Sequence, residues 1–243
     1  MEFLFVLIVG LIAGTISGIV GFGSSIMLMP VLVIAFGPLQ AVPIMAIAAI
    51  MANFSRILAW WREVDWRAAG AYAVTAVPSA ALGARTLLIL PPRLIEGALG
   101  AFFILMIPAR RWLSSHDFKL GLWHLALTGA IVGFITGIVV TTGPITVPIF
   151  LAYGLVKGAF LATEAAGSLA VYTTKAIVFR SFGALPLDAI IKGLLIGTSL
   201  MAGSFIAKRF VLKLDANRFR FLMDALMLIS GATMLWAAAT GTL

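Results

Sequence analysis

Two short polar stretches interrupt the apolar sequence, and their residues could bind an anion. They contain Gly21, Gly23, Ser24 and Ser25 in the first stretch and Thr141, Thr142, Gly143 and Pro144 in the second. A helix that begins after such a break presents N–H groups and a partial positive charge of about half a unit. The hydroxyls add further donors. The stretches therefore predict an anion site, with simple capping of the following helices as the alternative.

Two cations lie inside apolar segments, where a charge is expensive and marks a candidate functional site. Arg56 and Lys175 occupy matching positions of two similar sequence halves, and Asn53 and Tyr172 precede them by one turn. The four residues predict a positively charged, polar wall for the anion site. The alternative is that both long side chains extend along their helices to the membrane surface.

Glu164 lies about two turns into another apolar segment and three turns before Lys175. It is a candidate for proton coupling, and an ion pair with a cation on another helix is the alternative. The chain has no cysteine, and its two histidines are isolated from each other and form no cluster of metal ligands, so no metal site is predicted. Without a nucleophile pattern or a nucleotide-binding motif, the sequence predicts neither enzyme activity nor a cofactor.

The elements that must position these residues are membrane helices. Apolar residues make up 62% of the chain, charged residues make up 11%, and the mean hydropathy is +1.13. Ordinary soluble domains are about half apolar. The net charge of +8 comes from Lys and Arg between apolar blocks, which is typical of residues at lipid headgroups. A lipid bilayer is therefore the predicted partner, and a nucleic acid is not.

The apolar residues fall into ten blocks, at about 3–20, 24–36, 40–61, 68–90, 94–109, 120–140, 144–156, 158–180, 186–207 and 218–239. Eight blocks approach spanning length. The blocks 24–36 and 144–156 are short, and at about 1.5 Å per residue they cover only part of a core about 30 Å thick. The predicted fold is an all-α polytopic membrane protein with about eight long transmembrane helices and two half-helices after the breaks.

The chain also contains an internal repeat. Gly10, Gly14 and Gly18 recur with the same spacing as Gly129, Gly133 and Gly137, each 119 residues later. We predict two homologous repeats, 1–113 and 118–243, whose glycine stripes pack closely on each other or on a neighbouring helix. Duplicated halves are common in secondary transporters, with the site at the repeat interface. The Lys and Arg counts do not decide between parallel and inverted halves.

The order of glycines, helix break and Pro30 in the first half, repeated with Pro148 in the second, resembles the sulfite exporter TauE/SafE family. The likeness covers essentially the whole chain. It implies a membrane transporter that moves sulfite, organosulfonates or related sulfur compounds, chiefly outward. The second break, with its two threonines, departs from the glycine-rich breaks of that family, and this departure bears on the substrate more than on the class.

Together these observations predict a secondary transporter that exports sulfite or a small sulfonate-like anion without ATP. The predicted location is the inner membrane of a bacterium, as a multi-pass protein. The alternatives are a transporter of another small anion or metabolite and a membrane scaffold or assembly factor. The sequence allows a homo-oligomer.

Overall fold

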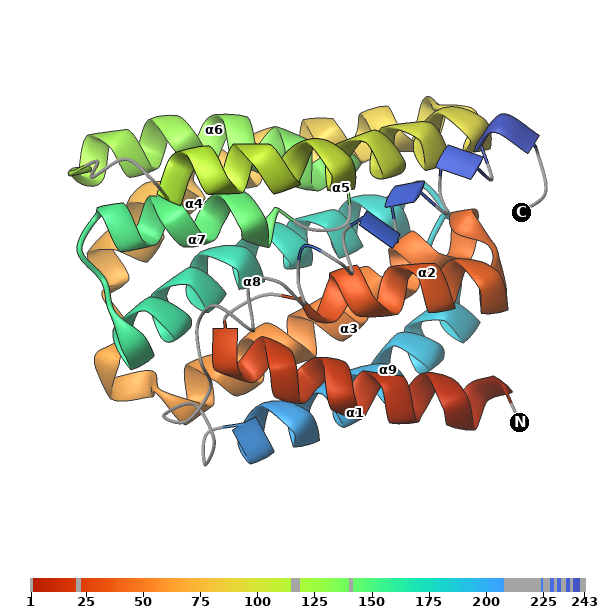
Figure 1. Ribbon diagram of the computed structural model, residues 1–243, viewed down its shortest axis with the longest axis horizontal. Coiled ribbons are helices and arrows are strands. Elements are labelled where there is room, and N and C mark those ends of the chain that lie inside the picture. Colours follow the sequence, from red (N-terminus) through yellow and green to blue (C-terminus); the bar gives the residue numbers. More distant parts are fainter. Residues whose placement is uncertain are drawn as a thin grey trace.

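The computed structural model describes residues 2–20, 23–114, 119–139 and 142–207, and short pieces between residues 224 and 240. In this part of the chain every regular element is a helix, as predicted (Figure 1). The helices are α1 (Glu2–Val20), α2 (Ser24–Phe36), α3 (Pro38–Ala59), the 3-10 helix η1 (Trp61–Glu63), α4 (Trp66–Ile89), α5 (Pro92–Ser114), α6 (Leu122–Ile138), α7 (Gly143–Ala152), α8 (Lys157–Ser181) and α9 (Leu187–Ala207).

The surface of the helices is compatible with a lipid environment. Three described segments are long and apolar enough to cross a membrane, and they are Gln40–Ala59 in α3, α4, and α9. Large apolar side chains are exposed around the outside, among them Ile8, Val74, Leu82, Ile131 and Ile177. Hydrocarbon tolerates such side chains where water does not. The predicted number of about eight long transmembrane helices stays a prediction.

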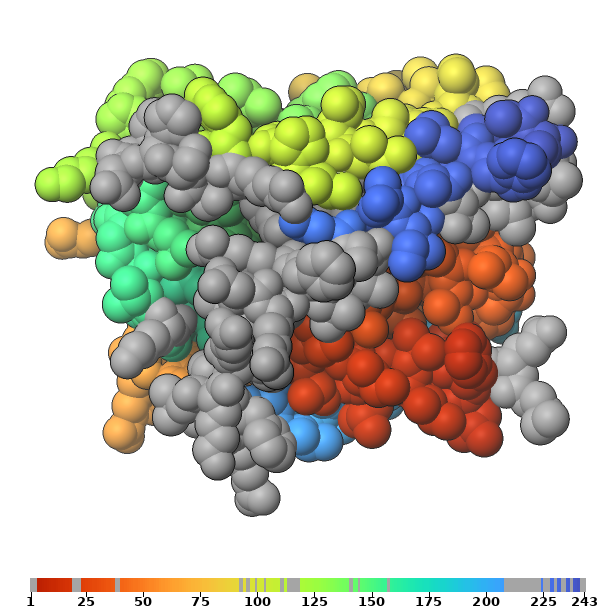
Figure 2. Space-filling model, in the orientation of Figure 1, coloured from red at the N-terminus to blue at the C-terminus, as the bar shows by residue number. Residues whose placement is uncertain are grey.

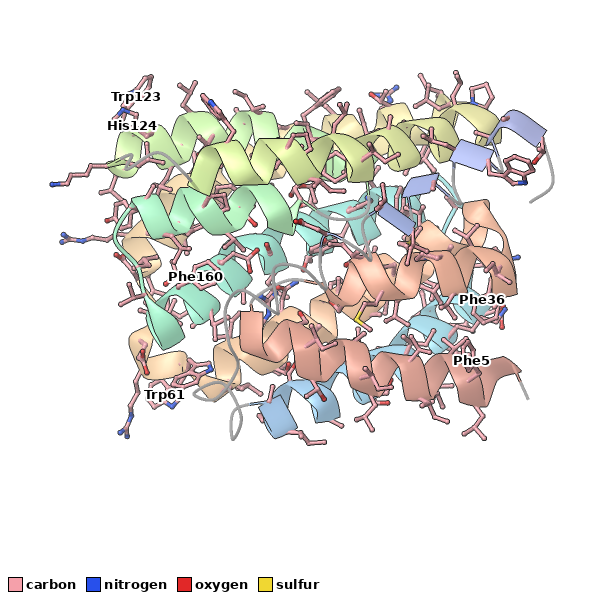
Figure 3. The ribbon with its side chains drawn as sticks, viewed as in Figure 1. Phe5, Phe36, Trp61, Trp123, His124 and Phe160 are labelled. Carbon is pink, nitrogen blue, oxygen red and sulfur yellow. The ribbon has the colours of Figure 1, made fainter. Side chains whose placement is uncertain are left out.

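Aromatic side chains mark the two ends of the bundle. Figure 3 shows Trp61 and Trp123 at one end and Phe5 and Phe36 at the other. The side chains of Trp61 and Trp123 are 60% and 68% exposed. Tryptophan is enriched at the headgroup level of membranes because it has an apolar ring and a polar N–H group. These positions fit a membrane normal along the long direction of the bundle.

Helices α3 and α8 form the centre of the bundle and pack against each other. The pair α4–α6 covers one side and the pair α1–α9 covers the other (Figure 1). Figure 2 shows α5 along the top of one face, with α1 and α2 below it. Helix α3 is largely buried, and this central position brings its polar residues next to those of α8.

The two short helices fold back beside the helices that precede them. Helix α2 has the predicted bounds, whereas α7 ends four residues earlier than predicted, at Ala152. Gly154 has a φ of +104°, which favours glycine, and it turns the chain away from α7. The backbone N–H group of Leu120 donates to the carbonyl of Ala152 at 3.0 Å, so α6 begins where α7 ends. Neither half-helix therefore extends the helix before it.

The glycine stripes allow helices to pack with their backbones in close contact. A Cβ atom on Gly14 would overlap the carbonyl oxygen of Leu200 in α9, and a Cβ atom on Gly133 would overlap the carbonyl oxygen of Ala76 in α4. Each stripe therefore packs on a helix from the other half of the chain. Of the two predicted arrangements, packing on a neighbouring helix is confirmed, and packing of the stripes on each other is not observed.

We expect Gly14→Ala to destabilise the protein by about 1–3 kcal/mol, because the added methyl group must push α1 away from α9. Gly70→Ala is the matched control. Gly70 is exposed in the second turn of α4 with nothing within 4 Å of an added Cβ atom, so Ala should be neutral or slightly stabilising there. Thermal unfolding in detergent measures both variants. Equal midpoints would contradict the close contact of α1 with α9.

Candidate functional site

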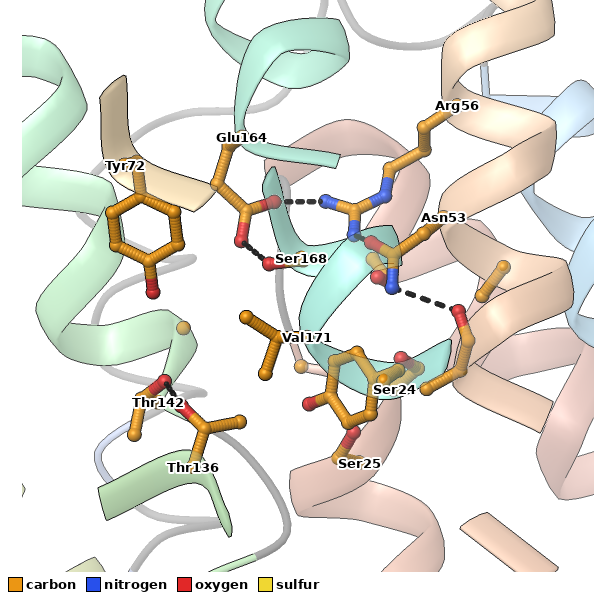
Figure 4. Close-up of a pocket in the computed structure, with 16 residues that line it drawn as sticks. Ser24, Ser25, Asn53, Arg56, Tyr72, Thr136, Thr142, Glu164, Ser168 and Val171 are labelled. Carbon is orange, nitrogen blue, oxygen red and sulfur yellow. Dashed lines mark hydrogen bonds and ion pairs between the residues drawn. The ribbon is translucent and has the colours of Figure 1, made fainter. Parts of the chain in front are cut away.

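A small polar cavity lies between the first turns of α2 and α7 and the central helices α3 and α8 (Figure 4). Its volume is about 30 Å³, which is room for about two water molecules. The polar and charged residues that line it are Ser17, Ser24, Ser25, Asn53, Arg56, Tyr72, Thr136, Thr142, Glu164, Ser168 and Tyr172. Few side chains around the cavity are purely apolar, so its wall can satisfy the oxygens of a polar ligand.

The two helix breaks border this cavity. Gly23 precedes α2 with a φ of +115°, a conformation that other residues rarely adopt. Ser24 and Ser25 form the first turn of α2 and are buried. Thr142 precedes α7, and its hydroxyl bonds to that of Thr136 at 2.5 Å. Thr142 occupies the N-cap position of α7, but its side chain makes no capping bond, so capping does not explain Thr142.

Arg56 and Glu164 form an ion pair beside the cavity. The guanidinium Nη1 atom donates to the Glu164 Oε2 atom at 2.9 Å, and Nη2 donates to the side-chain carbonyl of Asn53. The exposed fractions of Arg56 and Glu164 are only 6% and 3%. At a separation of about 4 Å and an effective dielectric constant of about 20, two unit charges attract by about 4 kcal/mol. Of the two interpretations of Glu164, the ion pair is therefore observed.

Two hydroxyl groups bind the other oxygen of the Glu164 carboxylate. Ser168 Oγ donates to Oε1 at 2.7 Å, and Thr146 Oγ1 donates to the same atom at 3.3 Å. Ser168 lies one turn after Glu164 on α8, whereas Thr146 comes from α7. Donors from three helices thus meet on one carboxylate, and Figure 4 shows Arg56 and Ser168 each bonded to a different one of its two oxygens.

Lys175 is bound to the end of α6. Its ammonium donates to the carbonyl of Thr136 at 2.9 Å and to that of Val139 at 2.8 Å. These carbonyls belong to the last turn of the helix, where the backbone leaves acceptors without intrahelical partners and the helix dipole is negative. Lys175 is 1% exposed. The lysine therefore stabilises the broken end of α6, directly behind the cavity wall.

The structure brings most of the predicted site residues together. Nine of them line the cavity, namely Gly23, Ser24, Ser25, Asn53, Arg56, Thr142, Gly143, Glu164 and Tyr172. Lys175 is not among the lining residues, and Gly21 and Thr141 lie outside the described residues. Arg56 and Lys175 are both buried, so the alternative in which their side chains extend along the helices to the membrane surface is not observed.

Sequence analysis missed five polar residues of the site. They are Ser17, Tyr72, Thr136, Thr146 and Ser168. Ser17 and Thr136 could have been found, since they occupy matching repeat positions 119 residues apart. The spacing of Ser168 from Glu164, one helical turn, is a weaker signal. We find no sequence signal that distinguishes Tyr72 or Thr146 from ordinary core residues.

A larger cavity of about 510 Å³ lies between α3, α4 and the end of α8. Among the described residues that line it, Gln40 alone has a polar side chain, and residues such as Leu87, Phe179 and Phe182 supply the rest. An apolar wall of this kind leaves the charge of a small anion without donors. The smaller, polar cavity is therefore the candidate functional site.

Comparison with known proteins identifies a family for this chain. The sequence model of the sulfite exporter TauE/SafE family matches residues 6–234. No curated protein and no solved structure gives a significant match. The match extends over both helix breaks and over every helix that lines the cavity.

Proposed function

Because the chain belongs to the sulfite exporter TauE/SafE family, we propose that it exports sulfite or a small sulfonate-like anion across the inner membrane of a bacterium. The proposed site is the cavity between the first turns of α2 and α7. The single observation that carries this proposal is the meeting of both helix breaks with a buried guanidinium at one polar cavity.

The first turns of α2 and α7 suit an anion. The backbone N–H groups of Ser24 and Ser25 precede the first intrahelical bond of α2, which runs from Met27 to Gly23. In α7 the first such bonds start at Ile145 and Thr146. The positive ends of both helix dipoles therefore lie at the cavity, where they favour negative charge. The hydroxyls of the wall add donors without adding charge.

We also propose that residues 1–113 and 118–243 are inverted repeats. The directions of the helices support this, because α1 begins at the end of the bundle that Phe5 marks, whereas its sequence counterpart α6 begins at the opposite end, which Trp123 marks (Figure 3). Helix α1 packs on α9, and α6 packs on the counterpart of α9, which is α4. Gly83 and Gly203, which match between the halves, lie at these two contacts. Discontinuous helices at a repeat interface are a common plan for substrate sites in secondary transporters. An experimental structure with unrelated helix order in the two halves would overturn this proposal.

Export of an anion requires no ATP in this proposal. An inside-negative membrane potential drives negative charge outward with about 2.3 kcal/mol per charge per 100 mV. The cavity is small in this structure, so a substrate can enter only after the surrounding helices move. Opening of the cavity to alternate sides by rocking of one repeat against the other would give transport.

Flux of labelled sulfite in sealed vesicles tests the proposed function. Purified protein is reconstituted into lipid vesicles, and sulfite movement is followed with and without an imposed potential. We expect protein-dependent flux that increases when the sulfite-loaded side is negative. Methanesulfonate, sulfate and an amino acid are tested in parallel to rank the substrates.

Vesicles without protein provide the background. If the protein moves none of the sulfur oxyanions above this background, the transport proposal fails and a membrane scaffold becomes the better explanation. If it moves the amino acid in place of the anions, the protein is a transporter of a different substrate class.

A further inference from the structure

The environment of the Glu164 carboxylate is more elaborate than an ordinary ion pair. One oxygen accepts from the Arg56 guanidinium at 2.9 Å, and the other accepts from Ser168 at 2.7 Å and Thr146 at 3.3 Å. A guanidinium and two hydroxyls thus satisfy both oxygens of a buried carboxylate. Sulfite and sulfonates also present several oxygens around one centre, and guanidinium is suited to binding two of them at once.

The carboxylate and a substrate anion would compete for the same cation. Arg56, Glu164 and Ser168 all line the cavity, so an anion that enters it meets the guanidinium while Glu164 is already bound there. Two anions on one buried guanidinium leave a negative charge without a partner, which is strongly unfavourable. Binding therefore requires that Glu164 lose either its position or its charge.

The other titratable groups around Glu164 do not replace Arg56. Helix α4 contributes Tyr72, η1 contributes Glu63 near Gly158, and α8 itself contributes Tyr172 and Lys175. Asp65 donates its backbone N–H group to the hydroxyl of Thr163, the residue before Glu164. Lys175 is bound to the carbonyl groups at the end of α6. Among the described contacts of the Glu164 carboxylate, Arg56 is the cation.

We propose that Glu164 is a built-in ligand at the anion position of Arg56, and that substrate replaces it there when Glu164 takes up a proton. This inference rests on the proposed function and specifies how that site recognises its substrate. The proton binds a carboxylate oxygen, the ion pair between Arg56 and Glu164 breaks, and a new ion pair forms between Arg56 and the anion. The neutral carboxyl group can then donate its O–H to a neighbouring hydroxyl.

Proton uptake by Glu164 changes the net charge that moves with each anion. A sulfite dianion and the proton on Glu164 together have the composition and charge of hydrogensulfite. Net negative charge still moves outward, so the potential can still drive export. A sulfonate with one negative charge would instead move with no net charge, and the potential would not affect its flux.

The pH dependence of sulfite binding tests this inference. Sulfite affinity is measured across neutral pH for the wild type, Glu164→Gln and the charge-conserving control Glu164→Asp. Sulfite's own protonation is common to all three proteins and cancels in the comparison. We expect the wild-type affinity to fall with rising pH more steeply than that of Glu164→Gln, by up to about tenfold per pH unit. Glu164→Asp should keep the steep dependence because it keeps a titratable carboxyl group.

Infrared difference spectroscopy tests the wild type directly and does not depend on the folding of a variant. Addition of sulfite should produce the C=O band of a protonated carboxylic acid, with loss of a carboxylate band. No such band, or equal pH dependence in the wild type and Glu164→Gln, would overturn the inference while sulfite binding remains. If none of the three proteins binds any sulfur oxyanion, the proposed function fails together with the inference.

Discussion

Arg56→Gln is expected to destabilise the protein more than the double replacement of Arg56 and Glu164 by Gln. The single change leaves the Glu164 carboxylate buried without its cation, and breaking a buried ion pair in this way costs about 3–5 kcal/mol. The double change removes both charges and leaves two neutral groups that can bind each other. Thermal unfolding of the purified proteins in one detergent measures the difference.

Both of these variants should lose sulfite affinity by at least about tenfold, because each lacks the guanidinium that the anion would bind. The combination of stability and affinity separates two roles of Arg56. A double variant that is stable but does not bind identifies Arg56 as a ligand. Wild-type affinity in the double variant would show that the ion pair is structural and that the backbone N–H groups of α2 and α7 form the site without it.

Gly23→Leu is expected to abolish transport while the protein still inserts into the membrane. Gly23 adopts a left-handed conformation with a φ of +115°, and a side chain at this position would meet the edge of the cavity. Gly37→Leu is the matched control. Gly37 also has a positive φ of +77°, but an added Cβ atom there has nothing within 4 Å.

Both glycines have a positive φ, so Leu strains the backbone in both variants, by about 1–3 kcal/mol. Only Gly23 lies at the cavity. We therefore expect sulfite flux near background for Gly23→Leu and close to the wild-type level for Gly37→Leu, at equal amounts of inserted protein. Gly143→Leu, at the second break, should behave like Gly23→Leu. Wild-type flux in both break variants would remove the breaks from the mechanism.

Local sequence features were sufficient for the elements and for most of the site. Helix α2 has the predicted bounds because a glycine-rich break and Gly37 delimit it on both sides, and these residues act through their own backbone conformations. The polar residues at the breaks were predictable for the same reason. Broken backbone inside a membrane must lie against protein or a hydrated cavity. The sequence itself shows which residues form the break.

The repeat was the most informative long-range signal in the sequence. It singled out Arg56 and Lys175 as a matched pair of cations inside apolar segments, and in the structure both side chains are buried. It did not indicate that the two cations differ in their partners. Arg56 binds an acid 108 residues away, whereas Lys175 binds carbonyls at the end of α6. The first half has no acidic residue at the position that matches Glu164. The difference between the partners of Arg56 and Lys175 therefore follows from this one residue.

The sequence by itself therefore determined the helices, the two breaks, the close-packing glycine stripes and the residue types of a polar cavity. The tertiary structure decided which helices meet, and with them the partners of the buried charges Arg56, Glu164 and Lys175. Glycine spacing specifies that a helix surface is flat but not which helix lies on it. A buried charge takes whichever opposite charge or carbonyl the packing of α3, α6 and α8 brings within reach, and that choice depends on distances through space that spacing along the chain does not contain.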